Sequence, residues 1–172
     1  MYNAKELREH LGSKEKTDLI KVIVKCYRKN PDLQREVDLL IEGDSFIDQT
    51  RKDFNDQVAS LNIQSPGFYK DLLQDYVKVI KDKKERVEAH FKVVDKLLGY
   101  CDLYEEGDIH RHLMVASSTY GKAIKILVSS PDLWKEKQEE ALKLAERFAE
   151  WNYEAGYQAV TYYKEAEREM GN

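Results

Sequence analysis

The stretch Asn30-Pro31-Asp32-Leu33 is the clearest helix start in this sequence of 172 residues. The side chain of Asn30 can accept hydrogen bonds from the first free amides of a helix. Pro31 fits the first helical position, because its missing N–H would have no intrahelical partner there. Asp32 suits the positive end of the helix dipole. The sequence therefore predicts a helix that begins at residue 31.

Two other places repeat this pattern, Ser65-Pro66 and Ser130-Pro131. On either side of these three starts, apolar residues recur at helical spacing almost throughout, and no segment alternates as a strand would. The fold class predicted is all-α: a single-domain array of about eight helices, as stacked hairpins or an irregular bundle, with no sheet. Six polar residues at 81–86 interrupt the pattern of 66–98, which favours two helices with a break near 81–84 over one long helix with an exposed waist.

The composition agrees with long helices in one domain. Apolar residues make up 42% and charged residues 35% of the chain, and only three prolines and eight glycines interrupt it. We expect one all-helical domain over 1–172, with a possible division into 1–64 and 65–172.

The helix expected after Ser13 is the most continuously apolar. Leu19, Ile20, Val22, Ile23 and Val24 are too close together for a narrow stripe, so this helix is expected to be buried on more than one side. The two cysteines, Cys26 and Cys101, lie in such apolar segments and are both expected to be small buried residues rather than a disulfide. His90 lies opposite an apolar stripe, which places it at the surface or half-buried.

One cluster has the residue types of a metal or acid–base site: Glu105, Glu106, Asp108, His110 and His112. However, residues two apart on a helix point in divergent directions, whereas helical metal ligands are three or four apart. A metal-dependent or acid–base enzyme that uses this region is therefore the alternative interpretation. No catalytic residue is assigned, no cofactor is expected, and Asp108, His110 and His112 are kept only as metal candidates.

The C-terminal segment is rich in aromatic residues. Five of them are candidates for binding a partner, because tyrosine and tryptophan dominate interface hot spots. They are Trp151, Tyr153, Tyr157, Tyr162 and Tyr163. The competing interpretation is that most of these rings pack into the core with their hydroxyl groups at its edge. Gly156, among them, would let another backbone approach closely.

The net charge and the hydropathy of the sequence indicate which kinds of partner the protein is expected to bind. The net charge is −4 and the two signs are interleaved, so nucleic acid is not expected as the main partner, and weak binding along 78–86 is a second alternative. No apolar stretch is long enough to span a membrane, and the N-terminus lacks the apolar core of a secretory signal. A cytoplasmic location is expected.

Three stretches of the sequence resemble an uncharacterised family of small all-helical bacterial proteins, a domain of unknown function. They are Lys5-Glu6-Leu7-Arg8-Glu9-His10-Leu11 with Lys16-Thr17-Asp18-Leu19-Ile20, then Tyr104-Glu105-Glu106-Gly107-Asp108-Ile109 with Ser117, Tyr120 and Lys122-Ala123-Ile124-Lys125, and finally Gly156-Tyr157 in the last helix. The sequence departs from the family pattern at 151–155. The resemblance implies a helical fold and no active site.

The leading interpretation is therefore a non-enzymatic helical module for protein interaction or regulation, with a protein partner or self-association. It depends on the lack of a convincing catalytic motif and on the aromatic residues of the last helix.

Overall fold

The computed structural model describes residues 3–62, 64–104, 109–151 and 153–171, and these contain helices and no strand. The helices are α1 (Ala4–Gly12), α2 (Lys16–Tyr27), α3 (Pro31–Glu42), α4 (Asp44–Ala59), α5 (Pro66–Val79), α6 (Lys83–Leu103), α7 (Ile109–Val128), α8 (Pro131–Ala149) and α9 (Glu154–Glu169). The all-α prediction is confirmed. The expected break in 66–98 is also present, because α5 ends at Val79 and α6 begins at Lys83.

Local signals explain most helix ends. The Asn30 side chain accepts hydrogen bonds from the amides of Asp32 and Leu33, and Ser65 caps α5 in the same way. Gly43 ends α3 with a φ of 57°, a left-handed conformation that favours glycine. Two details differ from the prediction. Ser13, after which the next helix is expected, is the C-terminal cap of α1, and α2 begins only at Lys16. The Ser130 side chain makes no capping hydrogen bond.

The chain forms two units, Met1–Asp48 and Gln49–Asn172, and the boundary falls within α4. The possible division predicted after residue 64 lies further along the chain, beyond the end of this helix. The first unit contains α1–α3 and the beginning of α4, and within it α2 packs against α3. The second unit contains the remaining helices.

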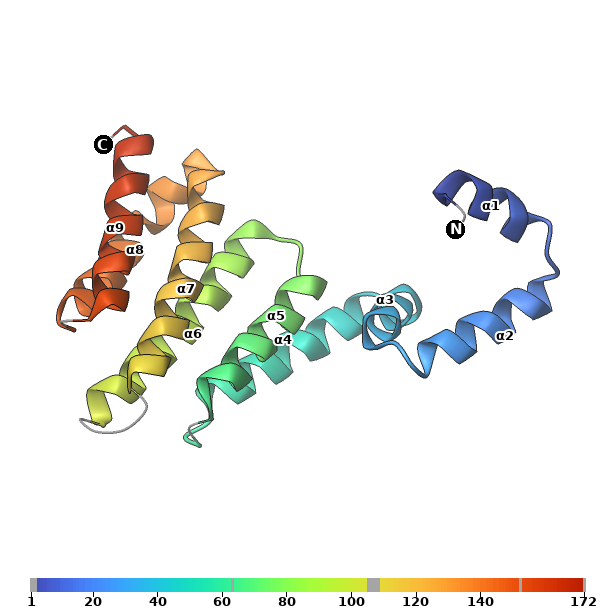
Figure 1. The fold of residues 1–172 in the computed structure, drawn as a ribbon, viewed down its shortest axis with the longest axis horizontal. Helices are drawn as coiled ribbons and strands as arrows, with labels where there is room; N and C mark the ends of the chain where they lie inside the picture. The colour runs from blue at the N-terminus through green and yellow to red at the C-terminus, as the bar shows by residue number, and fades with distance from the viewer. Residues whose placement is uncertain (1–2, 63, 105–108, 152, 172) are drawn as a thin grey trace. The chain divides into compact units, whose positions relative to one another are not determined.

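Helix α7 is the centre of the second unit. It packs along α6 and also contacts α5, α8 and α9, while α9 packs against α8 (Figure 1). Leu113, Tyr120 and Leu127 on α7 have no exposed surface, and neither do Val94 and Leu97 on α6. The core of this unit therefore lies around α7.

Polar contacts tie the outer helices to this core. The Tyr120 hydroxyl, fully buried, donates a hydrogen bond to the carbonyl oxygen of Ala141 on α8 at 2.8 Å. On the other side, Glu85 of α6 accepts hydrogen bonds from Arg51 of α4 at 2.7 and 3.0 Å and from the Tyr76 hydroxyl of α5 at 2.7 Å. The hydrogen bond from Arg51 is the main reason why the pKa of Glu85 is lowered. The carboxylate therefore joins three helices.

Two glycines allow close helix packing around α9. A Cβ on Gly121 of α7 would lie 2.6 Å from the Tyr162 ring, so this ring occupies the space that the glycine leaves. A Cβ on Gly156 would lie 2.5 Å from the carbonyl oxygen of Phe148 and 2.6 Å from that of Trp151. The backbone that approaches Gly156 closely is thus the end of α8 and the turn that follows it.

We expect Gly156→Ala to lower the free energy of unfolding by about 1–3 kcal/mol, because two backbone carbonyls cannot move aside without distorting the turn. Gly99 is a matched control, since it lies within α6 and a Cβ added there would have no atom within 4 Å. Gly99→Ala should stabilise the chain by about 0.5–1 kcal/mol through helix propensity. Urea unfolding followed by circular dichroism measures both. Equal effects of the two substitutions would contradict the packing argument.

Candidate functional site

Helix α2 leaves its apolar residues uncovered. Ile20, Val22, Ile23 and Val24 are 43–59% exposed, and no residue of α1, α2 or α3 is buried. The prediction that α2 is buried on more than one side is therefore wrong for the chain as described. Its apolar arc is wider than its contact with α3 covers. Cys26, expected to be buried, is exposed for the same reason.

Helix α3 also carries two large aliphatic residues that are exposed. Leu40 is 84% exposed and Ile41 is 75% exposed. The contact between α2 and α3 includes a hydrogen bond of 2.8 Å from the Tyr27 hydroxyl to Asp38. We call Ile20, Val22, Ile23, Val24, Leu40 and Ile41 the α2–α3 aliphatic set.

The five aromatic candidates near the C-terminus have different surroundings. Tyr163 is 7% exposed and its ring centroid lies 5.7 Å from that of Trp134 on α8. Trp151 and Tyr162 are half-buried, and Tyr162 covers Gly121. Tyr153 and Tyr157 are exposed, at 44% and 64%. Of the five, these two are the most exposed to solvent.

Tyr153 lies beside further aromatic residues at one end of the second unit. Its ring centroid is 6.1 Å from that of His110 on α7. The Tyr100 ring of α6 stacks on the rings of Tyr104 and His112. The distances between ring centroids are 4.7 Å to Tyr104 and 3.9 Å to His112. Tyr100 and Tyr104 were not among the candidates predicted from the sequence, although their spacing of four residues places them on one side of the same helix end.

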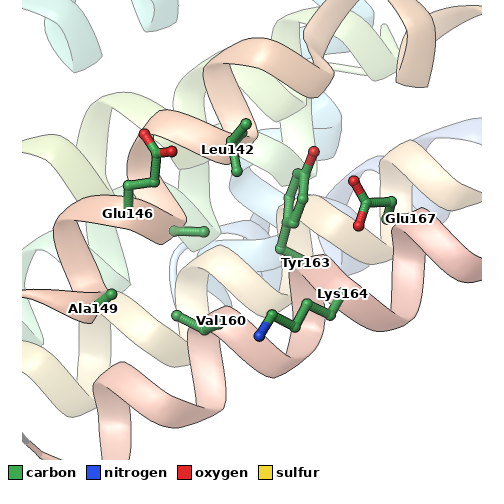
Figure 2. A pocket seen from close by; sticks show the side chains of 8 residues that line it. Leu142, Glu146, Ala149, Val160, Tyr163, Lys164 and Glu167 are labelled. Carbon is green, nitrogen blue, oxygen red and sulfur yellow. The ribbon is translucent and has the colours of Figure 1, made fainter. Parts of the chain in front are cut away.

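A groove of about 250 Å³ lies between α8 and α9. Figure 2 shows the ring of Tyr163 between Leu142 of α8 and Glu167 of α9. Ala149 and Val160 add apolar surface, while the side chains of Glu146 and Lys164 also line the groove. The groove is smaller than most pockets for drug-sized ligands.

The metal candidates are only partly described. Asp108, Glu105 and Glu106 lie outside the described residues. His110 is exposed, whereas His112 is buried against Tyr100, so the two imidazoles have different surroundings. Within the described ranges, no group of three histidine, cysteine, aspartate or glutamate side chains is placed to hold a metal ion.

The basic stretch 78–86 does not form an isolated basic surface. Lys84 pairs with Glu136 of α8, and the Lys83 ammonium donates hydrogen bonds to the hydroxyl groups of Ser129 and Ser130. Lys78 pairs with Asp75 at 3.9 Å. These contacts neutralise part of the charge that phosphate binding would need. Separately, no helix in the described part of the chain has the length and apolarity required to cross a bilayer.

Two titratable groups lie inside the second unit. Cys101 is buried, as expected, and burial raises the pKa of its thiol to about 11. His90 is 5% exposed, so the expectation of a surface or half-buried position is wrong. The ring Nδ1 lies 2.6 Å from the carbonyl oxygen of Arg86, and α7 supplies the cation of Lys122 nearby. Burial is the main reason why the pKa of His90 is lowered.

Because Tyr157 is exposed and Tyr163 is buried, replacing each with alanine should affect the free energy of unfolding differently. Tyr157→Ala should change the free energy of unfolding by less than about 1 kcal/mol, because most of its surface is in solvent already. Tyr163→Ala should cost about 3 kcal/mol through the cavity that it leaves beside Trp134. Chemical unfolding of the two variants measures this difference, and similar values would show that the burial of the two rings is wrongly assigned.

We expect His90 to make stability depend on pH below about 6.5, the ordinary value for histidine. Because the folded state lowers the pKa of His90, the unfolded state binds the proton more readily in this range. The contribution of His90 to stability is therefore fully present above pH 6.5, and it falls by at most about 1.4 kcal/mol per pH unit as pH decreases. Thermal unfolding between about pH 5 and 7 should show a smaller slope in His90→Gln. An unchanged slope would assign the effect to other groups.

Known proteins do not indicate a function for this chain, so the exposed aliphatic residues of α2 and α3 are the main guide to it. No family model matches the chain, and no curated protein or solved structure matches it.

Proposed function

We propose that the protein is a non-enzymatic helical interaction module and that the α2–α3 aliphatic set binds the partner. The observation that carries this proposal is the exposure of six large aliphatic side chains on two adjacent helices. Burying one such side chain fully is worth about 1.5–3 kcal/mol. Large aliphatic residues that gather in solvent mark interaction sites in many proteins.

The second unit provides an internal comparison. Val93, Val94, Leu97 and Leu98 on α6 have no exposed surface, although they are aliphatic residues like those on α2. In the second unit, neighbouring helices cover these aliphatic residues. In the first unit, the aliphatic residues of α2 and α3 stay exposed. This contrast supports a role for α2 and α3 outside the folding of their own unit.

The exposed aromatic residues Tyr153 and Tyr157 support the same class of function at a second place. Much of their surface is in solvent, and tyrosine is an effective anchor at interfaces. A cytoplasmic location, a bacterial source and kinship with the helical family of unknown function stay predictions of the sequence.

Site-specific photo-crosslinking tests the proposal. A photoreactive benzoylphenylalanine at Val22 of the full chain, expressed in the native cell, should give a discrete cross-linked product, because this position lies within the aliphatic set. The same residue at Lys70, exposed on α5, is the matched control and should give no such product. Lack of a discrete product from Val22, or the same products from both positions, would contradict the proposed function.

A further inference from the structure

The first unit carries its charges in two separate groups. Between residues 14 and 29, around α2, there are six basic and two acidic side chains. Between residues 30 and 48, around α3, there are six acidic and one basic side chain. One helix of the pair is therefore positively charged and the other negatively charged, and both present aliphatic residues to solvent.

Part of this charge has no partner within the unit. Lys21 pairs with Asp18 of its own helix at 3.1 Å, and Arg35 pairs with Asp32 at 2.9 Å. In the described part of the chain, Lys25 and Glu36 form no ion pair. Since Lys21 and Lys25 are four residues apart, they lie on one side of α2 and form a short basic row.

We propose that the α2–α3 aliphatic set binds a second copy of this chain, so that α2 of each copy lies along α3 of the other. This inference rests on the proposed function and names its partner. A two-fold axis forms the same contact twice, because each copy supplies one basic and one acidic helix. Aliphatic residues would form the centre of the contact, and Lys21 and Lys25 of one copy would face acidic side chains of α3 in the other copy, Glu36 among them, at its rim.

The distribution of charge favours a second copy over other partners. An anionic surface, whether nucleic acid or lipid, would attract α2 but repel the acidic α3 that packs beside it. A second copy matches both helices at once. The net charge of −4 opposes association of copies in general, so the attraction has to come from the local pairing of α2 with α3.

Charge reversal with complementation tests this arrangement. Sedimentation equilibrium of the full chain should give a monomer–dimer equilibrium whose dissociation constant increases with salt. Lys21→Glu with Lys25→Glu should raise that constant by about tenfold or more, because each reversal acts at two symmetry-related places. Glu36→Lys with Glu42→Lys should do the same. An equimolar mixture of the two double variants should restore dimers, because each α2 then meets an oppositely charged α3.

The matched control is Lys70→Glu with Lys164→Glu, which reverses two exposed lysines in the second unit. This variant should have the dissociation constant of the wild type, apart from a small effect of net charge. Circular dichroism checks that every variant keeps its helices. A wild-type chain that stays monomeric from nanomolar to high micromolar concentration would overturn the proposal. So would a mixture of the two double variants that stays monomeric.

The two proposals can fail separately. If the chain is monomeric but Val22 cross-links to a different protein, the interaction function stands and the dimer is overturned. If Val22 cross-links to another copy and complementation restores dimers, both are supported. If Val22 gives no discrete product and the chain is monomeric, both are overturned.

Discussion

The packing of four other helices around α7 is the constraint on which the second unit depends. The buried residues of α7 occupy more than one side of the helix, so α5, α6, α8 and α9 all contact it, and each must approach closely. Gly121 permits the approach of α9 by leaving room for the Tyr162 ring, and Tyr120 fixes α8 through a buried hydrogen bond. In a close-packed interior, a position that needs a glycine is as restrictive as one that needs a large ring.

The first unit shows what happens without such a central helix. Its helices contribute aliphatic residues, but α2 and α3 cover each other only in part. The hydrophobic free energy that the second unit uses for folding is therefore still available for binding in the first. The separation of basic and acidic residues between α2 and α3 adds selectivity, because charge decides which surfaces approach productively while apolar contact supplies most of the affinity. This division of roles makes the interaction proposal specific to one place in the chain.

The aromatic residues show how one sequence feature serves two purposes. Tyr163 and Tyr162 pack within the second unit, against Trp134 and Gly121, while Tyr153 and Tyr157 near the start of the same segment face solvent. The spacing of these residues around a helix produces both outcomes, because different sides of α9 meet different surroundings. An enzyme centre at 105–112 receives no comparable support, since His110 and His112 lie in different environments.

Local sequence is enough to predict where the helices begin and end. The capping residues Asn30 and Ser65, the prolines that follow them, and the polar break before α6 act within a few residues of the chain, so their effect can be predicted without tertiary structure. Which apolar side of a helix is covered depends instead on how the helices pack. Ile23 and His90 show the limit of prediction from pattern, because burial depends on helices far away in the chain: Ile23 is exposed for lack of a covering helix, and His90 is buried within the second unit. The candidate site followed from that same physical fact, since the aliphatic residues of α2 and α3 mark a binding surface because the helices of their own unit leave them exposed.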